Sequence, residues 1–194
     1  MQIKIVTQPP NIPKFENLAL GFFSDEKPPR GFCGLVDWRL NGAISRELAA
    51  GRITGAAEEQ VVFAFSRRLP VARVLLMGMG PLDELTYDAL YEAGYRLAKT
   101  VSGMRCREFA FSIPGIGRCR LLAATMTQAV VTGCFDFFSQ NREVTGAVSP
   151  CVLADERWSE EVLEGLNKFK TQAEGDKTEE IFELTMSSAL AEVI

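Results

Sequence analysis

The chain has 194 residues, of which 47% are hydrophobic and 24% are charged, and its formal net charge at pH 7 is −4. This composition predicts one globular domain with a helical extension, and no apolar run approaches the roughly 18 residues that a membrane span needs. The first residues alternate like a strand and form no basic-then-apolar leader, so no signal peptide is expected. The chain has no histidine, which excludes Ser–His and Cys–His nucleophile systems within one chain.

Apolar periodicity and Gly or Pro breaks divide the chain into strands that alternate with helices. Strands are predicted at residues 2–7, 18–23, 60–65, 71–77, 108–113 and 148–153. Helices are predicted at residues 37–50, from Thr86 onward, at 118–138, along the stripe of Trp158, Val162, Leu166 and Phe169, and at 181–193. This order predicts an α/β fold, a three-layer α/β/α sandwich with a mixed central sheet. Residues 1–170 are expected to form that domain, and residues 171–194 a polar linker and a C-terminal amphipathic helix.

Four residues carry more specific expectations. Thr86 is predicted to be the N-cap of the helix that follows it. Pro150 has no backbone N–H to donate, which suggests that the strand at 148–153 lies at a sheet edge. Trp38 and Trp158 are interpreted as packing residues, because no interleaved basic and aromatic residues indicate binding of single-stranded nucleic acid.

The distribution of charges bears on the ligands of the protein, and the spacing of the cysteines bears on its cellular compartment. Residues 155–194 carry 11 acidic and 4 basic side chains, whereas residues 1–154 carry 14 acidic and 17 basic ones. The acidic tail is interpreted as a solvated helix face, or alternatively as a segment that competes with an anionic ligand for the basic body. The five cysteines are widely spaced and form no Cys-x-x-Cys pair, which predicts reduced thiols in a cytoplasmic protein. No residue set marks a metal site or a cofactor, so none is predicted.

Two glycine turns are candidate ligand sites because ligands of parallel α/β folds bind at the carboxyl ends of the strands. Gly78 and Gly80 follow one predicted strand, and their backbone N–H groups could approach a phosphate. Gly115 and Gly117 follow another, and Arg118 is predicted to lie in the first turn of the next helix. The alternative for both turns is purely structural, with glycines that reverse the chain and a solvated arginine.

Four segments of the chain, at residues 32–44, 48–55, 73–80 and 133–138, carry a resemblance to a known family. They are similar to a helix opening, a Gly-x-x-x-Gly turn, a strand that ends in Gly-Leu-Gly, and an aromatic Gly-x-Tyr-x-Phe-Asp-x-Tyr segment. With these segments in this order, the chain resembles the N-terminal domain of the leucyl (cytosol) aminopeptidase family. The resemblance implies a macro-domain-like α/β/α sandwich that stands alone without the catalytic domain.

The resemblance implies a binding or assembly role for this chain and no catalytic activity of its own. In the family the two-metal peptidase site lies in a separate C-terminal domain, so no catalytic or metal-binding residue is carried over to this chain. The expectation is a non-catalytic binding or assembly module, as a homo-oligomer or with a partner protein. The alternatives are a subunit associated with an aminopeptidase, or a protein that binds ADP-ribose or another anionic nucleotide, as macro domains do. The acidic isoelectric point near 5.1 argues against duplex DNA as the partner.

Overall fold

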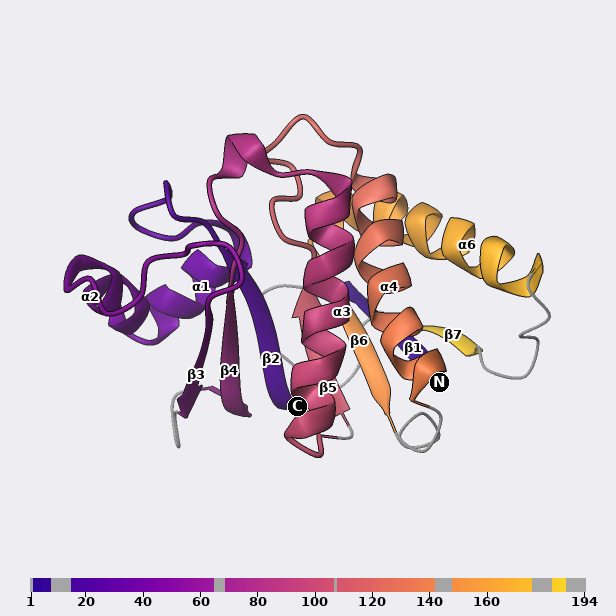
Figure 1. Ribbon diagram of the computed structural model, residues 1–194, viewed down its shortest axis with the longest axis horizontal. Coiled ribbons are helices and arrows are strands. Elements are labelled where there is room, and N and C mark those ends of the chain that lie inside the picture. Colours follow the sequence, from indigo (N-terminus) through magenta and orange to yellow (C-terminus); the bar gives the residue numbers. More distant parts are fainter. Residues whose placement is uncertain are drawn as a thin grey trace, which may run out of the picture.

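The computed structural model describes residues 2–7, 15–64, 69–106, 108–141, 148–175 and 183–187. Within these residues seven strands form one mixed sheet in the order β3-β4-β2-β5-β6-β1-β7, with helices on both faces (Figure 1). The strands are β1 (Gln2–Thr7), β2 (Phe15–Phe22), β3 (Gln60–Ala64), β4 (Val71–Gly78), β5 (Glu108–Ser112), β6 (Ser149–Ala154) and β7 (Glu183–Ser187). The helices are α1 (Gly31–Arg39), α2 (Ala43–Ala49), α3 (Tyr87–Gly103), α4 (Ala123–Gln140) and α6 (Ser159–Gly175), with 3₁₀ turns η1 (Leu82–Glu84) and η2 (Glu156–Trp158). The predicted α/β sandwich with a mixed sheet is confirmed.

The strands of the sheet run parallel to their neighbours except β3, which pairs antiparallel with β4. A parallel strand covered on both faces reads as a continuous apolar run. This explains why β4 is buried from Val74 to its end, whereas every residue of β3 is at least partly exposed. The antiparallel strand therefore forms one edge of the sheet.

The helices bury two separate apolar clusters against the two faces of the sheet. On one face α3, α4 and α6 enclose side chains such as Leu90, Val130 and Phe138. On the other face α1 and α2 enclose side chains such as Val36 and Ile44. Thr86 caps α3 as predicted, since its side-chain oxygen accepts a hydrogen bond from the amide of Ala89 at 3.1 Å. Within the described residues no helix is long and apolar enough to cross a membrane.

Helices α3 and α4 approach so closely that their contact requires glycine. A Cβ atom built on Gly133 would lie 2.0 Å from the carbonyl oxygen of Tyr91, and one on Gly94 would lie 2.0 Å from that of Val130. Real side chains do not tolerate such distances, so each glycine lets one helix backbone rest on the other. The phenol of Tyr91 adds a 2.7 Å hydrogen bond to the carboxylate of Asp136 across the same contact.

The predicted helix at 37–50 is wrong, because the structure has two helices there. Asn41 and Gly42 both have positive φ, 56° and 73°, and this left-handed pair ends α1 before α2 begins. The carboxylate of Asp37 accepts hydrogen bonds from the amides of Ile44 and Ser45 at 2.7 and 3.0 Å. Asp37 therefore caps the second helix from within the first, which residue spacing alone did not reveal.

Two predictions around the later strands are also wrong. Pro150 lies in β6, which is an interior strand between β5 and β1. Pro150 lies near the start of the strand, opposite Phe109 of β5 and one residue before the register with β1 begins at Cys151, a position at which a strand tolerates proline. The helix predicted at 118–138 begins at Ala123, and residues 118–122 form a turn in which the amide of Leu122 donates to the hydroxyl of Tyr87 at 3.0 Å.

The C-terminal part of the chain differs most from its prediction. Helix α6 continues to Gly175 through the predicted linker, and β7 replaces the middle of the helix predicted at 181–193. Strand β7 alternates polar and apolar residues and pairs in parallel with β1, so an available sheet edge decides its conformation. The rest of that predicted helix lies outside the described residues. Trp38, interpreted above as a packing residue, is 75% exposed on α1.

Candidate functional site

A crevice forms at the carboxyl ends of β2, β5 and β6, which lie side by side in the sheet. After β2 the chain turns to one face and forms α1, whose buried side chains belong to one apolar cluster. After β5 it turns to the other face and forms α4, whose buried side chains belong to the second cluster. Chains that depart to opposite faces from neighbouring parallel strands leave an opening between them, the usual ligand position in open α/β sheets.

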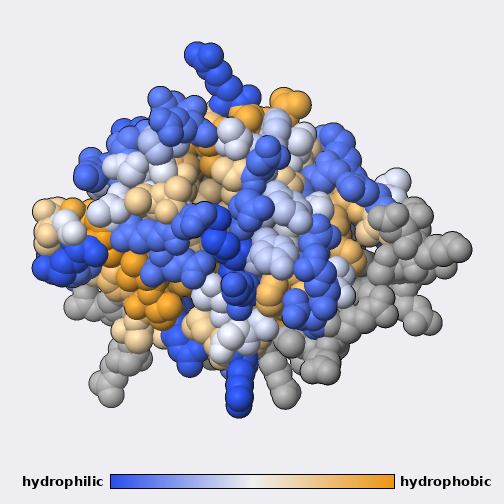
Figure 2. Space-filling model, in the orientation of Figure 1, coloured by the Kyte–Doolittle hydropathy of each residue, from blue (hydrophilic) through white to orange (hydrophobic). Residues whose placement is uncertain are grey.

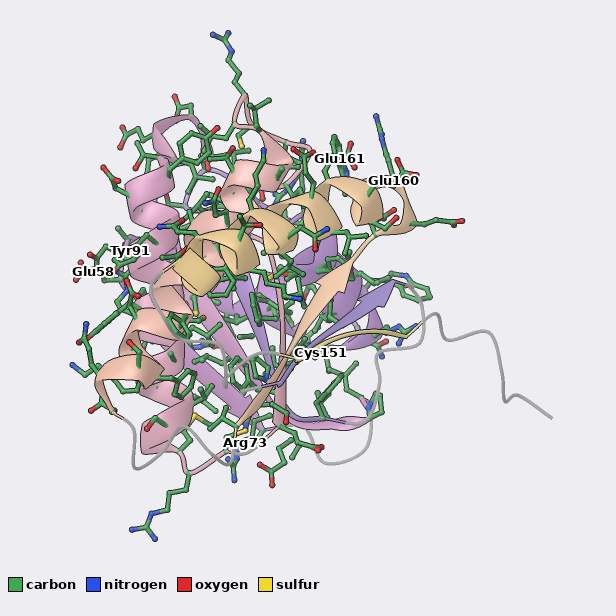
Figure 3. All side chains as sticks on the ribbon, turned by 90° about the vertical axis from the view of Figure 1, so that its right-hand side faces the viewer. Glu58, Arg73, Tyr91, Cys151, Glu160 and Glu161 are labelled. Atoms are coloured by element: carbon green, nitrogen blue, oxygen red, sulfur yellow. The ribbon has the colours of Figure 1, made fainter. Side chains whose placement is uncertain are left out.

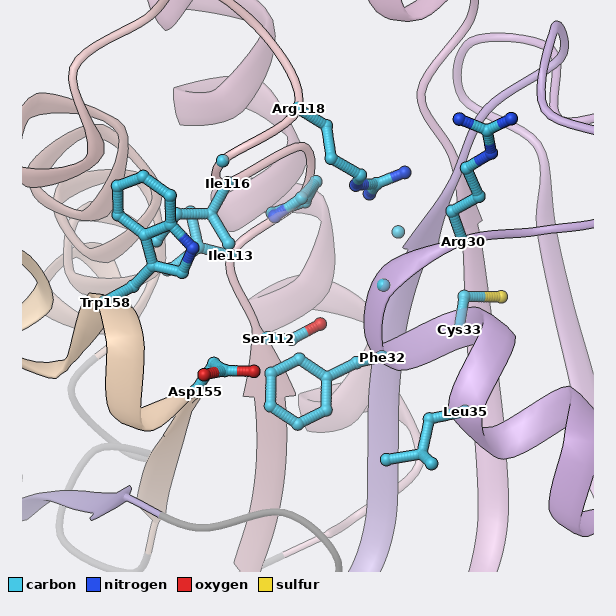
Figure 4. Close-up of a pocket in the computed structure, with 14 residues that line it drawn as sticks. Arg30, Phe32, Cys33, Leu35, Ser112, Ile113, Ile116, Arg118, Asp155 and Trp158 are labelled. Atoms are coloured by element: carbon cyan, nitrogen blue, oxygen red, sulfur yellow. The ribbon is translucent and has the colours of Figure 1, made fainter.

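This opening is a pocket of about 420 Å³. Its lining comes from the end of β2, the start of α1, the loop after β5 and the segment after β6 (Figure 4). The lining residues are Gly21, Arg30, Gly31, Phe32, Cys33, Leu35, Ser112, Ile113, Pro114, Ile116, Gly117, Arg118, Asp155 and Trp158. The set combines two guanidinium groups, one carboxylate, one hydroxyl and two aromatic rings in a mostly apolar enclosure.

The guanidinium of Arg118 is fixed at the rim of the pocket by three contacts. Its Nη1 donates to both carboxylate oxygens of Glu26, which is only 8% exposed. Its Cζ lies 5.2 Å from the centre of the Phe23 ring, and its Nη2 lies 3.4 Å from the position that a Cβ on Gly31 would take. A cation over an aromatic face and paired with a buried carboxylate keeps one orientation. The guanidinium nitrogens that do not contact Glu26 therefore lie at the rim, and a ligand that binds them would remove little further side-chain entropy from Arg118.

The other polar groups come from three segments that face one another across the pocket. Arg30, just before α1, places a second guanidinium on the side opposite Trp158 (Figure 4). The Ser112 hydroxyl at the end of β5 lies between the Phe32 ring and Arg118 in that view, with the Asp155 carboxylate beside the ring. Hydroxyl and carboxylate oxygens accept hydrogen bonds from sugar hydroxyls, and aromatic rings pack against apolar ligand faces.

The loop after β5 supplies backbone donors as well. Gly115 and Gly117 both have positive φ, 75° and 70°, and the amide of Arg118 donates to the carbonyl of Gly115 at 2.9 Å. Within the described residues, the amides of Ile116 and Gly117 donate to no other backbone group. Successive free amides in a tight turn form a concave site that favours anions.

Gly117 also allows the indole of Trp158, which lines the pocket, to pack directly against the loop. A Cβ on Gly117 would lie 2.6 Å from Cζ2 of Trp158, so no other residue fits without displacing the indole. The guanidinium of Arg157 lies 5.3 Å from the same ring. Trp158 is therefore held between the loop and its neighbour in η2, with one edge facing the pocket.

The pKa of the Cys33 thiol limits the chemistry that is available in the pocket. Burial, and to a lesser degree the negative charge of Asp37, raise the pKa of the Cys33 thiol to about 12. The thiol therefore stays protonated at neutral pH and is a poor nucleophile. Among the described residues no group of three or more Cys, Asp or Glu side chains is placed to hold a metal ion.

The structure separates the two predicted glycine turns. Gly117 and Arg118 line the pocket, and Gly115 lies in the same loop, behind the lining and close to Leu85. Gly78 and Gly80 lie outside this lining, and their amides donate to the carbonyls of Glu59 at 2.7 Å and Gly55 at 2.9 Å. Those two amides are already bonded within the chain, whereas in the loop after β5 the amides of Ile116 and Gly117 donate to no backbone group among the described residues.

Sequence reasoning missed Arg30, Phe32, Ser112, Asp155 and the position of Trp158 in the lining. The glycine turns mark the carboxyl ends of β4 and β5 only, whereas ligands can bind at the carboxyl end of any strand in a parallel sheet. Asp155 directly follows β6 and Arg30 directly precedes α1, so the same rule applied to β2 and β6 would have found both. The start of α1 was hidden because the helix was predicted to begin six residues later, at residue 37.

A second hollow adjoins the pocket. It has a volume of about 560 Å³ and lies between η1 and the turn at residues 118–121, with Asp25 and Arg120 on its walls. Arg118 belongs to the lining of both spaces. The fixed guanidinium therefore stands at the junction of two neighbouring spaces.

Comparison with known proteins places this chain in a family. Residues 19–137 match the model of the cytosol aminopeptidase family, N-terminal domain. The chain is 24% identical over 97 residues to a probable cytosol aminopeptidase of Cyanothece sp. and 26% identical over 99 residues to one of Nostoc punctiforme. The two matches cover 50% and 51% of this chain, but each covers only 20% of the relative. The chain thus spans about a fifth of the length of these curated relatives.

Solved structures support the same fold. A macrodomain of Oceanobacillus iheyensis superposes with a TM-score of 0.66 at 16% identity over 87% of this chain and 92% of its own. A Trypanosoma brucei macrodomain in complex with ADP-ribose gives 0.65 at 18% identity over 86% and 68%. Tomato leucine aminopeptidase gives 0.57 at 16% identity over 87% and 36%. Since the matched family model covers more than half of the chain, the protein belongs to the cytosol aminopeptidase family through its N-terminal, macro-like domain.

Proposed function

We propose that this domain is a non-catalytic binding module whose pocket takes a ribose phosphate of the ADP-ribose class. The observation that carries the proposal is the anion-binding side of the pocket. There the guanidinium of Arg118, held by buried Glu26, lines the same pocket as Ile116 and Gly117, whose amides donate to no other backbone group among the described residues. Fixed cations and free amides in one turn are the usual means of binding a phosphate.

The rest of the pocket supports a larger ligand than inorganic phosphate. Trp158 and Phe32 supply aromatic surfaces for a sugar or base, and Asp155 and Ser112 supply acceptors for sugar hydroxyls. The adjoining hollow on the other side of Arg118 offers space for a second end of the ligand. A diphosphate that bridges two sugars has this shape, with charge in the middle and hydroxyls at either end.

The fold comparison supports the same ligand class. The Trypanosoma brucei macrodomain was solved in complex with ADP-ribose, and an Oceanobacillus iheyensis macrodomain was solved with ADP. The non-catalytic part of the proposal is supported by the pocket chemistry. Its thiol is held protonated, and the chain offers no histidine as a general base.

The test is calorimetric titration with ADP-ribose, ADP, ribose 5-phosphate and pyrophosphate. We expect ADP-ribose to bind more tightly than pyrophosphate, because only the nucleotide sugar uses the aromatic and acceptor groups. Arg118→Ala should weaken ADP-ribose binding at least about tenfold, the effect of about 1.4 kcal/mol for a lost charge-assisted contact. Lys99→Ala, which removes one positive charge from an exposed position on α3, should leave the affinity unchanged.

Two results would overturn the proposal. One is the absence of heat and of thermal stabilisation with all four ligands, since saturation at 100 times the dissociation constant should add about 2.7 kcal/mol. The other is equal binding to the unmodified protein and to Arg118→Ala, with both proteins shown to be folded by a cooperative melting transition.

A further inference from the structure

As far as the described residues go, strand β3 leaves one side of its backbone without a partner strand. It is the terminal strand of the sheet order and pairs only with β4 among the described residues. The amide of Gly78 donates to the carbonyl of Glu59, which makes residues 59 and 78 a hydrogen-bonded pair of the antiparallel ladder. Because such pairs alternate, Val61 and Phe63 bond to β4, whereas the N–H and C=O groups of Gln60, Val62 and Ala64 point outward.

Within the part of the chain that the structure describes, the outward side of β3 lacks the usual protections of an edge strand. Natural edge strands are blunted by lysine, proline, bulges or a covering segment. The five residues Gln60–Ala64 contain no charge and no proline, and the Val62 side chain at their centre is 49% exposed. Apolar surface gathers on the left of Figure 2, where α1, α2 and β3 lie in Figure 1. An uncharged open edge with an exposed β-branched residue favours pairing with another strand.

The charges beside the edge select the partner and its direction. Glu58 lies just before β3, and Arg73 of β4 lies opposite Ala64 at the far end, with Glu58 higher than Arg73 in Figure 3. Both side chains are exposed, and the Glu58 carboxylate, itself 75% exposed, also lies 3.5 Å from the guanidinium of Arg96 on α3 of the same chain. An exposed ion pair of this kind contributes little, so the carboxylate can still interact with a second copy. An antiparallel second copy would bring its Glu58 end to the Arg73 end of the first, whereas a parallel copy would oppose Glu58 to Glu58. The edge is thus complementary to itself about a two-fold axis.

We infer that the protein self-associates through β3, with a second copy of the chain pairing antiparallel so that Val62 faces Val62. This register joins Gln60 of each copy to Ala64 of the other and continues the sheet across the interface. The two exposed valines would then cover each other on one face. A contact of five residues per strand is short, so the dimer is expected to be weak and dependent on concentration.

The test is sedimentation velocity of the full chain from low micromolar to near-millimolar concentration. Val62→Pro removes an N–H that points away from β4, so it should leave the β4 ladder intact and raise the dimer dissociation constant at least about tenfold. Val62→Lys should do the same through charge, as edge lysines do. Val62→Thr, which keeps a neutral β-branched side chain, should stay within about threefold of the unmodified protein.

Amide exchange followed by nuclear magnetic resonance gives a second readout that another interface would not reproduce. Raising the concentration should slow exchange at Val62 and Ala64, while Val61 and Phe63 are protected at all concentrations through their bonds to β4. A chain that stays monomeric throughout the range overturns the inference. So does a dimer that forms equally in Val62→Lys and Val62→Pro, or one that forms without protecting Val62. Cooperative melting of each variant keeps a folding defect distinct from a lost interface.

Discussion

The carboxylate of Glu26 and the guanidinium of Arg118 join two loops that are 92 residues apart in the sequence. Glu26 follows β2 and Arg118 follows β5, so the pair closes one side of the crevice between chains that leave the sheet on opposite faces. Glu26 is 8% and Arg118 21% exposed, which places the pair at the boundary between core and pocket. The same contact thus joins the two loops and fixes the guanidinium at the rim of the pocket.

Replacement of Glu26 should separate these two roles. Glu26→Gln removes the charge but keeps the size of the side chain, and we expect the free energy of unfolding to fall by about 1–3 kcal/mol, measured by urea denaturation. Binding of a dianionic ligand should tighten, because Arg118 would no longer be neutralised. Glu47→Gln, which breaks the exposed pair with Arg52, is the control and should leave stability nearly unchanged. Equal effects of the two substitutions would contradict the assignment.

Gly117→Ala should weaken ligand binding more than it destabilises the protein. The new methyl group would displace the Trp158 ring, which its Cβ would approach to 2.6 Å, and positive φ adds about 1–2 kcal/mol of strain. Gly51→Ala is a matched control, since Gly51 has φ +67° with no atom within 4 Å of the new Cβ. Calorimetric titration should find reduced affinity only in Gly117→Ala. Unchanged affinity would mean that the indole is not part of the binding surface.

Gly133→Ala should be strongly destabilising, because the new Cβ would lie 2.0 Å from the carbonyl oxygen of Tyr91 and force α3 and α4 apart. We expect a loss of about 2–4 kcal/mol in the free energy of unfolding, in the range of overpacked core substitutions. Gly103→Ala, at the end of α3, has no atom within 4 Å of its new Cβ and should be neutral. Thermal melting of both variants distinguishes a backbone contact from a general effect of replacing glycine.

The carboxylate of Glu59 should make the protein more stable at neutral than at acid pH. Burial raises its pKa, but hydrogen bonds from the amides of Thr54 and Gly55 and from the Thr54 hydroxyl outweigh burial, so the pKa is lowered from its usual 4.5. A depressed folded-state pKa gives stability that is present above the unfolded pKa and is lost as pH falls through the folded one. The melting temperatures of the unmodified protein and Glu59→Gln should therefore converge below about pH 4.5. A difference that is constant from pH 7 to pH 3 would refute this origin.

Thiol labelling should follow the acidities of the cysteines. Burial raises the pKa of Cys33 and Cys134 to about 12 and that of Cys106 to about 11. A thiol of pKa 12 has on the order of one thiolate in 10⁴ molecules at pH 8, so iodoacetamide should react slowly at these sites. Half-buried Cys119 should be alkylated first. Mass spectrometry after timed quenching would contradict the assignment if Cys33 were modified as fast as Cys119.

The regular parts of the fold follow from local sequence. Buried runs such as residues 71–77 predict parallel strands, and Thr86 with the apolar spacing after it predicts α3. These elements agree with the structure because local propensity and tertiary burial favour the same conformation there. The break between α1 and α2 could not be predicted in this way, since it depends on Asp37 reaching Ile44 and Ser45 after the chain has turned.

The pocket was less predictable than the sheet because its residues meet only in three dimensions. The sequence indicates a glycine turn before Arg118, but it does not indicate that buried Glu26 fixes the guanidinium. The two glycine turns are equivalent in sequence, and only the hydrogen bonds of Gly78 and Gly80 distinguish them. The same limit applies to β7, whose conformation depends on the edge that β1 provides.

The pairing of β1 has a consequence for the order of assembly during synthesis. Lys4 pairs with Cys151, and Gln2 pairs with Glu183, so β1 bonds to strands that are made much later than β1 itself. Strands β2 and β4, together with α3, can associate before β6 has been synthesised and can pair with β1. The half of the sheet beyond β5 is thus expected to form last, by closing a long loop whose entropy must be offset at the final step.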